Sequence, residues 1–248
     1  MREVSLLEML QKGVHFGHQE SRWNPKMKPY IFTSRNGVHI LNLEATRDKL
    51  AIAVQFAEAT AQAGGTILFV GTKRQVKAIV RKHAEACSMP FVTERWVGGT
   101  LTNFTTIHEL IKKLRRLKSE QAAGLLDRYT KKEQVGIQKE IVKLQTEIGG
   151  IEMVDKIPQA LFVIDAAKER TAIREARTMK VPIIALCDSN TNPDLVQYPI
   201  PANDDATKSV DFIAGFLAEA ISAGIKHKAA TAPAATQTPP AAPVTPAA

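Results

Sequence analysis

Short apolar segments that alternate with amphipathic segments are the feature that most constrains the fold of this chain. Residues 66–71 (TILFVG), 160–165 (ALFVID) and 181–188 (VPIIALCD) are nearly continuous apolar runs, which are typical of strands buried on both faces. The first two runs each precede a segment with apolar residues at helical spacing, and residues 44–63 and 206–221 show the same spacing. The alternation predicts an α/β domain, over 44–103 and 151–226, with a parallel sheet covered on both faces by helices.

Residues 104–150 interrupt this alternation. Their apolar positions recur at intervals of three and four residues in two series, which predicts two helices that meet along a narrow seam. A turn near Gly124 would fold the helices back on each other, so we expect an inserted antiparallel coiled-coil hairpin. The two series are Ile107, Leu110, Leu114, Leu117, Gln121 and Ile137, Ile141, Leu144, Ile148, Ile151.

The positive charge is concentrated in the first part of the chain. Residues 1–150 hold 24 Lys and Arg against 14 Asp and Glu, whereas residues 151–248 hold nine against 11. Such an excess favours a polyanionic partner, with an acidic protein or an anionic membrane as alternatives. The hairpin contributes Lys112, Lys113, Arg115, Arg116 and Lys118, which are either a solvated helix face or a binding surface.

The N-terminal region, residues 1–43, combines a short helix with a basic and aromatic arm. Phe16, Trp23 and Tyr30 are interleaved with basic residues, as single-stranded or irregular RNA requires, although the rings could instead anchor the arm to the core. Asn36-Gly37 lies between two apolar runs and predicts a tight β-hairpin turn next to Arg35.

The segment RWVGGTLTNF, residues 95–104, joins the sheet domain to the helical hairpin. Two adjacent glycines would let the backbone turn tightly and approach another chain, and the short polar residues after them could contact phosphate or cap the next helix. We interpret Trp96 and Phe104 as packing anchors.

Carboxylates gather where strands of the predicted sheet end. Asp188 follows an apolar run, and Asp204-Asp205 precedes the last helix, so the three side chains can converge at the carboxyl edge. Such oxygen ligands suit a hard cation such as magnesium, and a neighbouring imidazole such as His18 would shift the preference towards zinc. The alternative is that Asp204 or Asp205 caps the helix that follows.

The sequence carries no complete catalytic motif. FVGTKRQ lacks the glycine patterns of nucleotide-binding loops, and neither GxSxG nor HExxH occurs. A catalytic triad assembled from residues distant in the chain stays open at this point. We expect Lys73 and Arg74 to contact an external phosphate backbone. Cys87 and Cys187 are expected to be buried free thiols, because two cysteines without a CxxC motif make no framework.

The chain shows neither a membrane-span pattern nor a cleavable N-terminal leader, which predicts a cytoplasmic protein without a membrane partner. The Ala/Pro/Thr-rich residues 227–248 predict a disordered tail.

Four ordered segments together closely resemble the bacterial small-subunit ribosomal protein family that is second in the conventional numbering. They are GVHFGHQESRWNPKMKPYIFTSRNGVHILNLEAT, ILFVGTKRQ, RWVGGTLTNF and VDKIPQALFVID, and the resemblance covers about Leu6 to Ile225. It implies a flavodoxin-like sheet with a protruding hairpin, docked on small-subunit ribosomal RNA beside neighbouring ribosomal proteins. It also implies help in recruiting the large mRNA-binding protein of that subunit. A structural protein of this kind is expected to have no enzyme activity, no required cofactor and no small-molecule substrate.

The resemblance and the charge pattern together select the candidate RNA contacts. They are Arg22, Trp23, Asn24, Lys26, Lys28, Arg35, Lys73, Arg74, Arg95, Gly98, Gly99, Thr100, Thr102, Asn103, Lys112, Lys113, Arg115 and Arg116. A soluble nucleotide-using enzyme and a basic protein-interaction scaffold are the rival interpretations.

Overall fold

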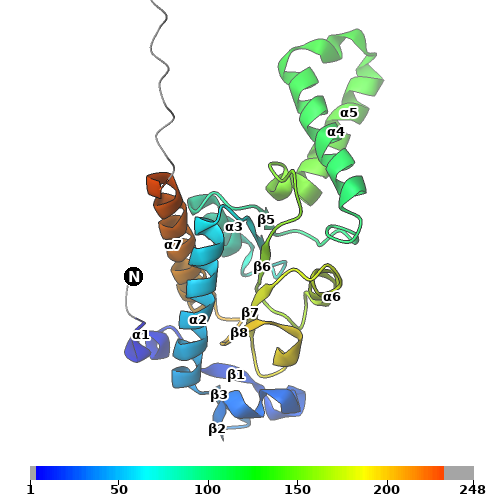
Figure 1. The fold of residues 1–248 in the computed structure, drawn as a ribbon. Helices are drawn as coiled ribbons and strands as arrows, with labels where there is room; N and C mark the ends of the chain where they lie inside the picture. Colours follow the sequence, from blue (N-terminus) through cyan, green and yellow to red (C-terminus); the bar gives the residue numbers. More distant parts are fainter. Residues whose placement is uncertain (1–3, 232–248) are drawn as a thin grey trace, which may run out of the picture.

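The computed structural model describes residues 4–231 and shows two sheets and a projecting pair of helices (Figure 1). The larger sheet is parallel, in the order β5-β4-β6-β7-β8. This is the 2-1-3-4-5 order of flavodoxin-like doubly wound sheets. Its strands are β4 (Ile67–Val70), β5 (Phe91–Val92), β6 (Ala160–Val163), β7 (Ile183–Cys187) and β8 (Tyr198–Pro201).

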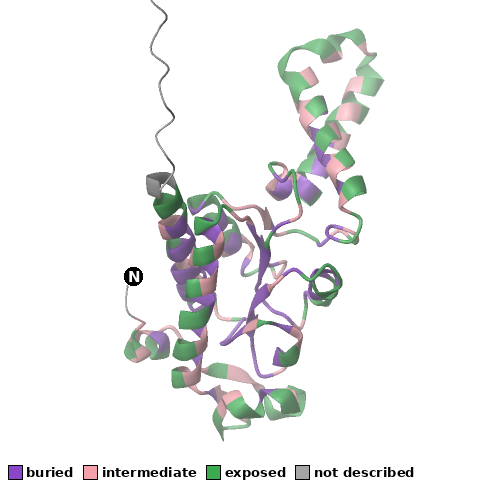
Figure 2. Ribbon diagram, in the orientation of Figure 1, coloured by how far each residue is buried: buried purple, intermediate pink, exposed green. Residues whose placement is uncertain are grey.

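Helices cover both faces of this sheet, so the α/β prediction is confirmed. One face packs against α2 (Leu43–Gln62), α3 (Lys77–Ala86) and α7 (Thr207–Thr231), and the short α1 (Leu6–Gln11) lies beside α2. The other face packs against α6 (Arg170–Thr178), the 95–104 segment and the base of the projecting helices. Successive strand residues alternate between the two cores, which is why each strand is apolar throughout (Figure 2).

The arm forms a smaller antiparallel sheet in the order β1-β3-β2. Its strands are β1 (Phe16–Gln19), β2 (Ile31–Arg35) and β3 (Val38–Leu41). Asn36 and Gly37 both have positive φ, at 53° and 73°, which is the backbone of the predicted tight turn. The 3-10 helices are η1 (Glu20–Arg22) and η2 (Pro25–Tyr30) here, and η3 (Leu125–Arg128), η4 (Gly149–Ile151) and η5 (Pro193–Leu195) elsewhere.

Two helices, α4 (Phe104–Ala122) and α5 (Lys131–Ile148), project from the sheet domain (Figure 1). The buried positions on α4 are Ile107, Ile111, Leu114 and Leu117, so Ile111 takes the place predicted for Leu110. Gln121 contacts α5 as its spacing predicted, but as an exposed polar residue, because its Nε2 donates to Gln138 Oε1 over 2.8 Å. Whether these helices supercoil as a coiled coil stays a prediction.

The sequence interpretation missed two short strands. β5 has only two residues, and β8 has the sequence YPIP, in which prolines cannot donate ladder hydrogen bonds. Both strands lie at the edges of the sheet, where such residues are tolerated.

The C-terminal boundary also differs. Disorder was predicted from residue 227, but α7 continues to Thr231, because the Ala-rich residues there favour a helix. Residues 232–248 lie outside the described part of the chain. Within residues 4–231 no helix is both long and apolar enough for a membrane span.

Candidate functional site

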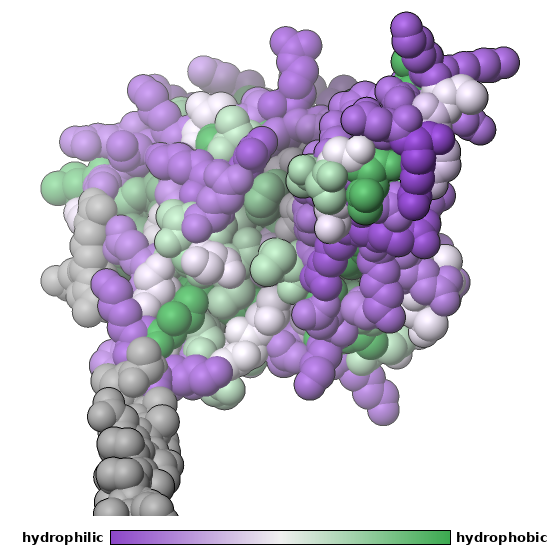
Figure 3. All heavy atoms as spheres, turned by 90° about the horizontal axis from the view of Figure 1, so that it is seen from above, coloured by the Kyte–Doolittle hydropathy of each residue, from purple (hydrophilic) through white to green (hydrophobic). Residues whose placement is uncertain are grey.

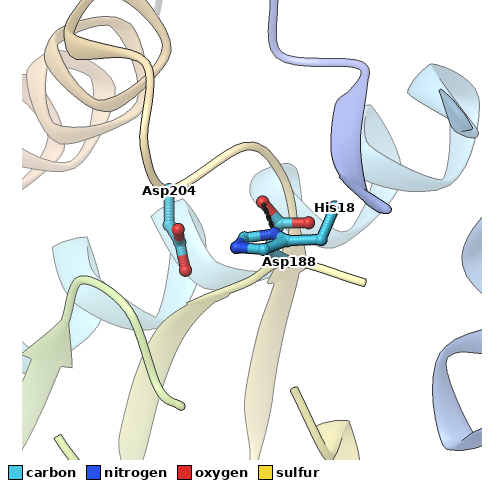
Figure 4. A group of neighbouring side chains, drawn as sticks. All are labelled: His18, Asp188 and Asp204. Atoms are coloured by element: carbon cyan, nitrogen blue, oxygen red, sulfur yellow. Dashed lines mark ion pairs between the residues drawn. The ribbon is translucent and has the colours of Figure 1, made fainter. Parts of the chain in front are cut away.

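The carboxylates predicted to converge do meet at the carboxyl edge of the large sheet (Figure 4). Asp188 follows β7 directly, Asp204 lies between β8 and α7, and His18 reaches them from β1 of the small sheet. His18 Nδ1 lies 3.0 Å from Asp188 Oδ2, and His18 Nε2 lies 3.5 Å from Asp205 Oδ2. Asp188 thus orients the imidazole and leaves Nε2 facing the remaining carboxylates, as in many metal sites.

The approach of β1 depends on Gly17. A Cβ at this position would lie 2.9 Å from Ser189 Oγ and 3.1 Å from the carbonyl oxygen of His39. The close approach allows the amide of His18 to donate to Ser189 Oγ over 2.8 Å. The small sheet is thereby tied to the end of β7 beside the cluster.

The ammonium group of Lys73 lies inside this cluster. Its Nζ is 2.7 Å from Asp165 Oδ2, 2.7 Å from Asp204 Oδ1 and 2.9 Å from Asp205 Oδ1. Lys73 was predicted to face external RNA, but the structure directs its charge inward, because three carboxylates attract it. Asp165 was missed, although it ends the apolar run ALFVID just as Asp188 ends the next one.

The electrostatics of the cluster leave it short of positive charge. Burial and the neighbouring charges of Asp165 and Asp188 raise the pKa of Asp204 to about 7, against the opposing effect of Lys73. The hydrogen bond to Asp188 raises the pKa of His18, and burial partly offsets this. Burial would lower the pKa of Lys73, but its carboxylate partners raise it overall.

One oxygen of the cluster has no partner. Asp204 is fully buried, and within the described residues its Oδ2 accepts no hydrogen bond. One ligand atom each from His18, Asp188 and Asp204 lie within 4.8 Å of one another. The arrangement can therefore accept a small cation. Within the described residues neither aspartate caps α7, because no amide of its first turn donates to either carboxylate. Asn203 Oδ1 forms the turn just before the helix by accepting from the amides of Asp205 and Ala206.

The 95–104 segment is held by a buried glutamate that sequence reasoning missed. Glu175 on α6 is 7% exposed, and its Oε1 accepts from Trp96 Nε1 over 3.0 Å and from the amide of Gly99 over 2.8 Å. Its Oε2 accepts from the amide of Leu101 over 3.0 Å and from the amide and hydroxyl of Thr102, each over 3.3 Å. The carboxylate therefore takes the place of an anion in a nest of backbone donors.

This arrangement changes the roles expected for the polar residues of the segment. Thr100 is buried and its hydroxyl donates to the carbonyl of Val97, and the Thr102 donors already serve Glu175. Asn103 occupies the N-cap position of α4 without a side-chain capping bond, and its Oδ1 accepts from Thr106. RNA contact by these side chains stays a prediction, but these bonds occupy the hydroxyl donors of Thr100 and Thr102. Trp96 is buried, as expected of an anchor.

The glycines of the segment differ from each other. Gly99 has a φ of +90°, which favours glycine, whereas a Cβ on Gly98 would meet open space. Gly98 is exposed, as is Arg95 three residues before it in the chain. Another chain can therefore approach the backbone closely at Gly98.

Predicted basic contacts fall into two groups. Lys113 pairs with Glu140, Arg115 with Asp155, Arg116 with Glu120 over 3.9 Å and Lys26 with Asp194 over 2.9 Å. The hairpin face is thus mixed in sign rather than nearly single-signed, because α5 and the segment after it supply acidic partners. The second group forms no ion pair within the described residues and is exposed: Arg22, Lys28, Arg35, Arg74, Arg95 and Lys112.

The two other arm residues are half-buried. Trp23 packs against His39 with 5.2 Å between ring centroids, and Asn24 Oδ1 caps η2 by accepting from the amide of Lys26. Cys87 and Cys187 are buried free thiols, as predicted.

A separate groove lies at the amino ends of β4 and β6, between the base of α5 and the end of α7. Its lining mixes polar and apolar groups, including Thr66, Met89, Gly150 and Met153 (Figure 3). It is on the opposite edge of the sheet from the carboxylate cluster, so the two features are independent.

Comparisons with known proteins give matches over most of the chain. The family model described as ribosomal protein S2 matches residues 9–224. The small ribosomal subunit protein uS2 of Coprothermobacter proteolyticus is 46% identical to this chain over 224 residues, which is 90% of this chain and 84% of the relative.

Proposed function

This chain belongs to the ribosomal protein S2 family, and from that premise we propose that it binds ribosomal RNA through the arm and the 95–104 segment. The membership makes the chain a structural constituent of the small ribosomal subunit in the cytoplasm and not an enzyme, as the sequence predicted. Phosphate contacts would supply most of the affinity, because Arg22, Lys28 and Arg35 of the arm and Arg95 of the segment are exposed cations without an ion pair within the described residues.

The observation that carries the proposal is the exposed backbone at Gly98. The buried carboxylate of Glu175 fixes the turn through its bonds to backbone amides. The outer side of the turn therefore presents a rigid backbone without a side chain at Gly98, three residues after Arg95. A preorganised surface of this kind loses little conformational entropy when a phosphate backbone docks on it.

The Gly98→Val substitution tests this contact. We expect the variant to fold normally, because its Cβ meets open space, but to be incorporated poorly into small subunits depleted of this protein. Gly136→Val is the matched control, since a Cβ on Gly136 also meets open space, on α5. Equal incorporation of the two variants, measured by sedimentation of the particles, would show that RNA does not approach Gly98.

We further propose that the carboxylate cluster binds one divalent cation. The unpartnered, buried Oδ2 of Asp204 supports this, together with His18 Nε2 and the carboxylate of Asp188. A nitrogen ligand favours zinc over magnesium, and Lys73 would stay on Asp204 Oδ1.

Titration of the purified full-length chain with zinc tests the cation site. We expect one bound equivalent for the wild type, loss of binding for Asp188→Asn, and unchanged binding for Asp48→Asn, an exposed aspartate on α2. Absence of zinc binding by the wild type would refute the site.

The last part of the proposal is recruitment of the large mRNA-binding protein of the small subunit. Exposed apolar side chains on α1 and β1 support a protein contact there, since Leu7 is 72%, Leu10 50% and Phe16 49% exposed. Subunits assembled with Leu7→Ser/Leu10→Ser should carry less of that protein. Unchanged content would count against recruitment by this surface.

A further inference from the structure

Basic residues are concentrated in and around helix α6, although residues 151–248 as a whole hold more acidic than basic residues. Five of the nine Lys and Arg in residues 151–248 lie between 168 and 180. The acidic residues in the same stretch, Glu169 and Glu175, are both buried. The exposed surface of this stretch is therefore positive throughout. We call Lys168, Arg170, Arg174, Arg177 and Lys180 the α6 ridge.

The arginines of the α6 ridge share one side of the helix. Arg170, Arg174 and Arg177 stand at positions i, i+4 and i+7, which lie within about 60° of one another around a helix and span about 10 Å along it. The opposite side, with Ala172, Ile173 and Ala176, packs into the core (Figure 2). The ridge therefore faces away from the sheet.

The ridge cations have no acidic partner. Within residues 4–231 none of the five forms an ion pair. Only one of their side chains donates a hydrogen bond, which runs from Arg170 Nε to the carbonyl of Ala167. On α4, by contrast, four of the five cations are paired, namely Lys113, Arg115, Arg116 and Lys118. Solvated helix faces usually mix signs, as those of α4 and α5 do, whereas the exposed charges of the α6 ridge are all positive.

The buried side of α6 is bonded to two loops that lead towards the proposed RNA contacts. Glu175 holds the 95–104 segment, and Glu169 Oε1 accepts from the amide of Thr72 over 3.1 Å, just before Arg74. The ridge is consequently fixed relative to Arg95 and Arg74. Guanidinium groups that are held in fixed positions favour binding to a phosphate backbone.

We propose that the α6 ridge is an RNA-binding surface that contacts the phosphate backbone of small-subunit ribosomal RNA. The inference rests on the proposed function and extends it to an element that the sequence assigned no contact. Charge complementarity selects RNA as the occupant, since three arginines with unoccupied donors on one face match successive phosphates.

The test compares two triple variants of the full-length chain for binding to small-subunit ribosomal RNA over a range of salt concentrations. The first is Arg170→Gln/Arg174→Gln/Arg177→Gln. The control is Arg47→Gln/Arg81→Gln/Lys82→Gln, which removes the same charge from the opposite face, where each residue pairs with an acid. We expect the ridge variant to lower the slope of log Kd against log salt by about two to three, and the control by less than one.

Arg170→Lys/Arg174→Lys/Arg177→Lys should restore most of the slope, because it keeps the charges. An unchanged slope in the Gln variant, or an equal change in the control, would overturn the proposal. Loss of contacts with neighbouring proteins without any loss of RNA binding would overturn it as well. Failure of the wild type to bind the RNA would instead refute the proposed function, so the two failures are distinguishable.

Discussion

Glu175 shows how one side chain can organise a functional surface without touching the partner. Its two oxygens collect five donors from Trp96 to Thr102, and this fixes the turn that exposes Gly98. A carboxylate that accepts several backbone amides is stabilised in its charged form, and the pKa of Glu175 is accordingly lowered despite its burial.

We expect Glu175→Gln to lower the free energy of unfolding at pH 7 by about 1–3 kcal/mol, because the amide nitrogen faces donors and leaves some of them unpaired. Urea unfolding measures this. Glu109→Gln on α4 is the control, since Glu109 is exposed. A loss no larger than that of the control would show that the buried bonds contribute little.

The same residue predicts a pH dependence. Because the folded-state pKa of Glu175 lies below its ordinary 4.5, its contribution is present above that pH and is lost as the pH falls through the lowered value. The stability difference between wild type and Glu175→Gln should therefore stay constant from pH 8 to 6 and shrink below about 4.5. A difference that grows on acidification would contradict this assignment.

At the scale of elements, α4 and α5 project as a pair whose stability depends on the end nearest the sheet. Ile111 is fully buried, in the same core cluster as residues of the large sheet, whereas Val142 on α5 is 58% exposed. The ion pairs along the helices join α4 to α5 and to the segment after it.

Ile111→Ala should lower the free energy of unfolding by about 2–4 kcal/mol, because it leaves a cavity at the base of the helices. Thermal or urea unfolding of Val142→Ala, which opens no cavity, should match the wild type to within about 0.5 kcal/mol. Equal effects of the two substitutions would mean that the base of the hairpin is not a cooperative part of the core.

For the whole molecule, pairing matters more than net charge. The chain carries a formal charge of +8, but many cations are already neutralised by acidic neighbours within the fold. A paired cation must exchange its acid for a phosphate, so it adds less to RNA binding than an unpaired one.

Arg35→Gln should therefore reduce the salt slope of RNA binding by about one, whereas Lys118→Gln, which removes the partner of Glu152, should reduce it by less than half of that. Filter binding at several salt concentrations measures both slopes. If the slopes fell equally, pairing inside the protein would have no bearing on RNA contact.

The sequence by itself determined the features that depend on residues close together in the chain. Continuous apolar runs identified β4, β6 and β7, helical spacing identified α2 and α7, and Asn36-Gly37 identified the β2–β3 turn. Convergence of Asp188 and Asp204 was also predictable, since parallel strands end at one edge, whereas His18 reaches them from β1 of the small sheet.

Only the tertiary structure decided which charged groups meet. Lys73 lies 131 residues before Asp204, and Trp96 lies 79 residues before Glu175, so no local pattern reports these contacts. Four of the five α4 cations predicted to form a binding surface are paired, whereas the basic residues around α6 were passed over and form no ion pair within residues 4–231. Local spacing determines which face of a helix is buried, but the charge available to a partner depends on what the fold brings beside it.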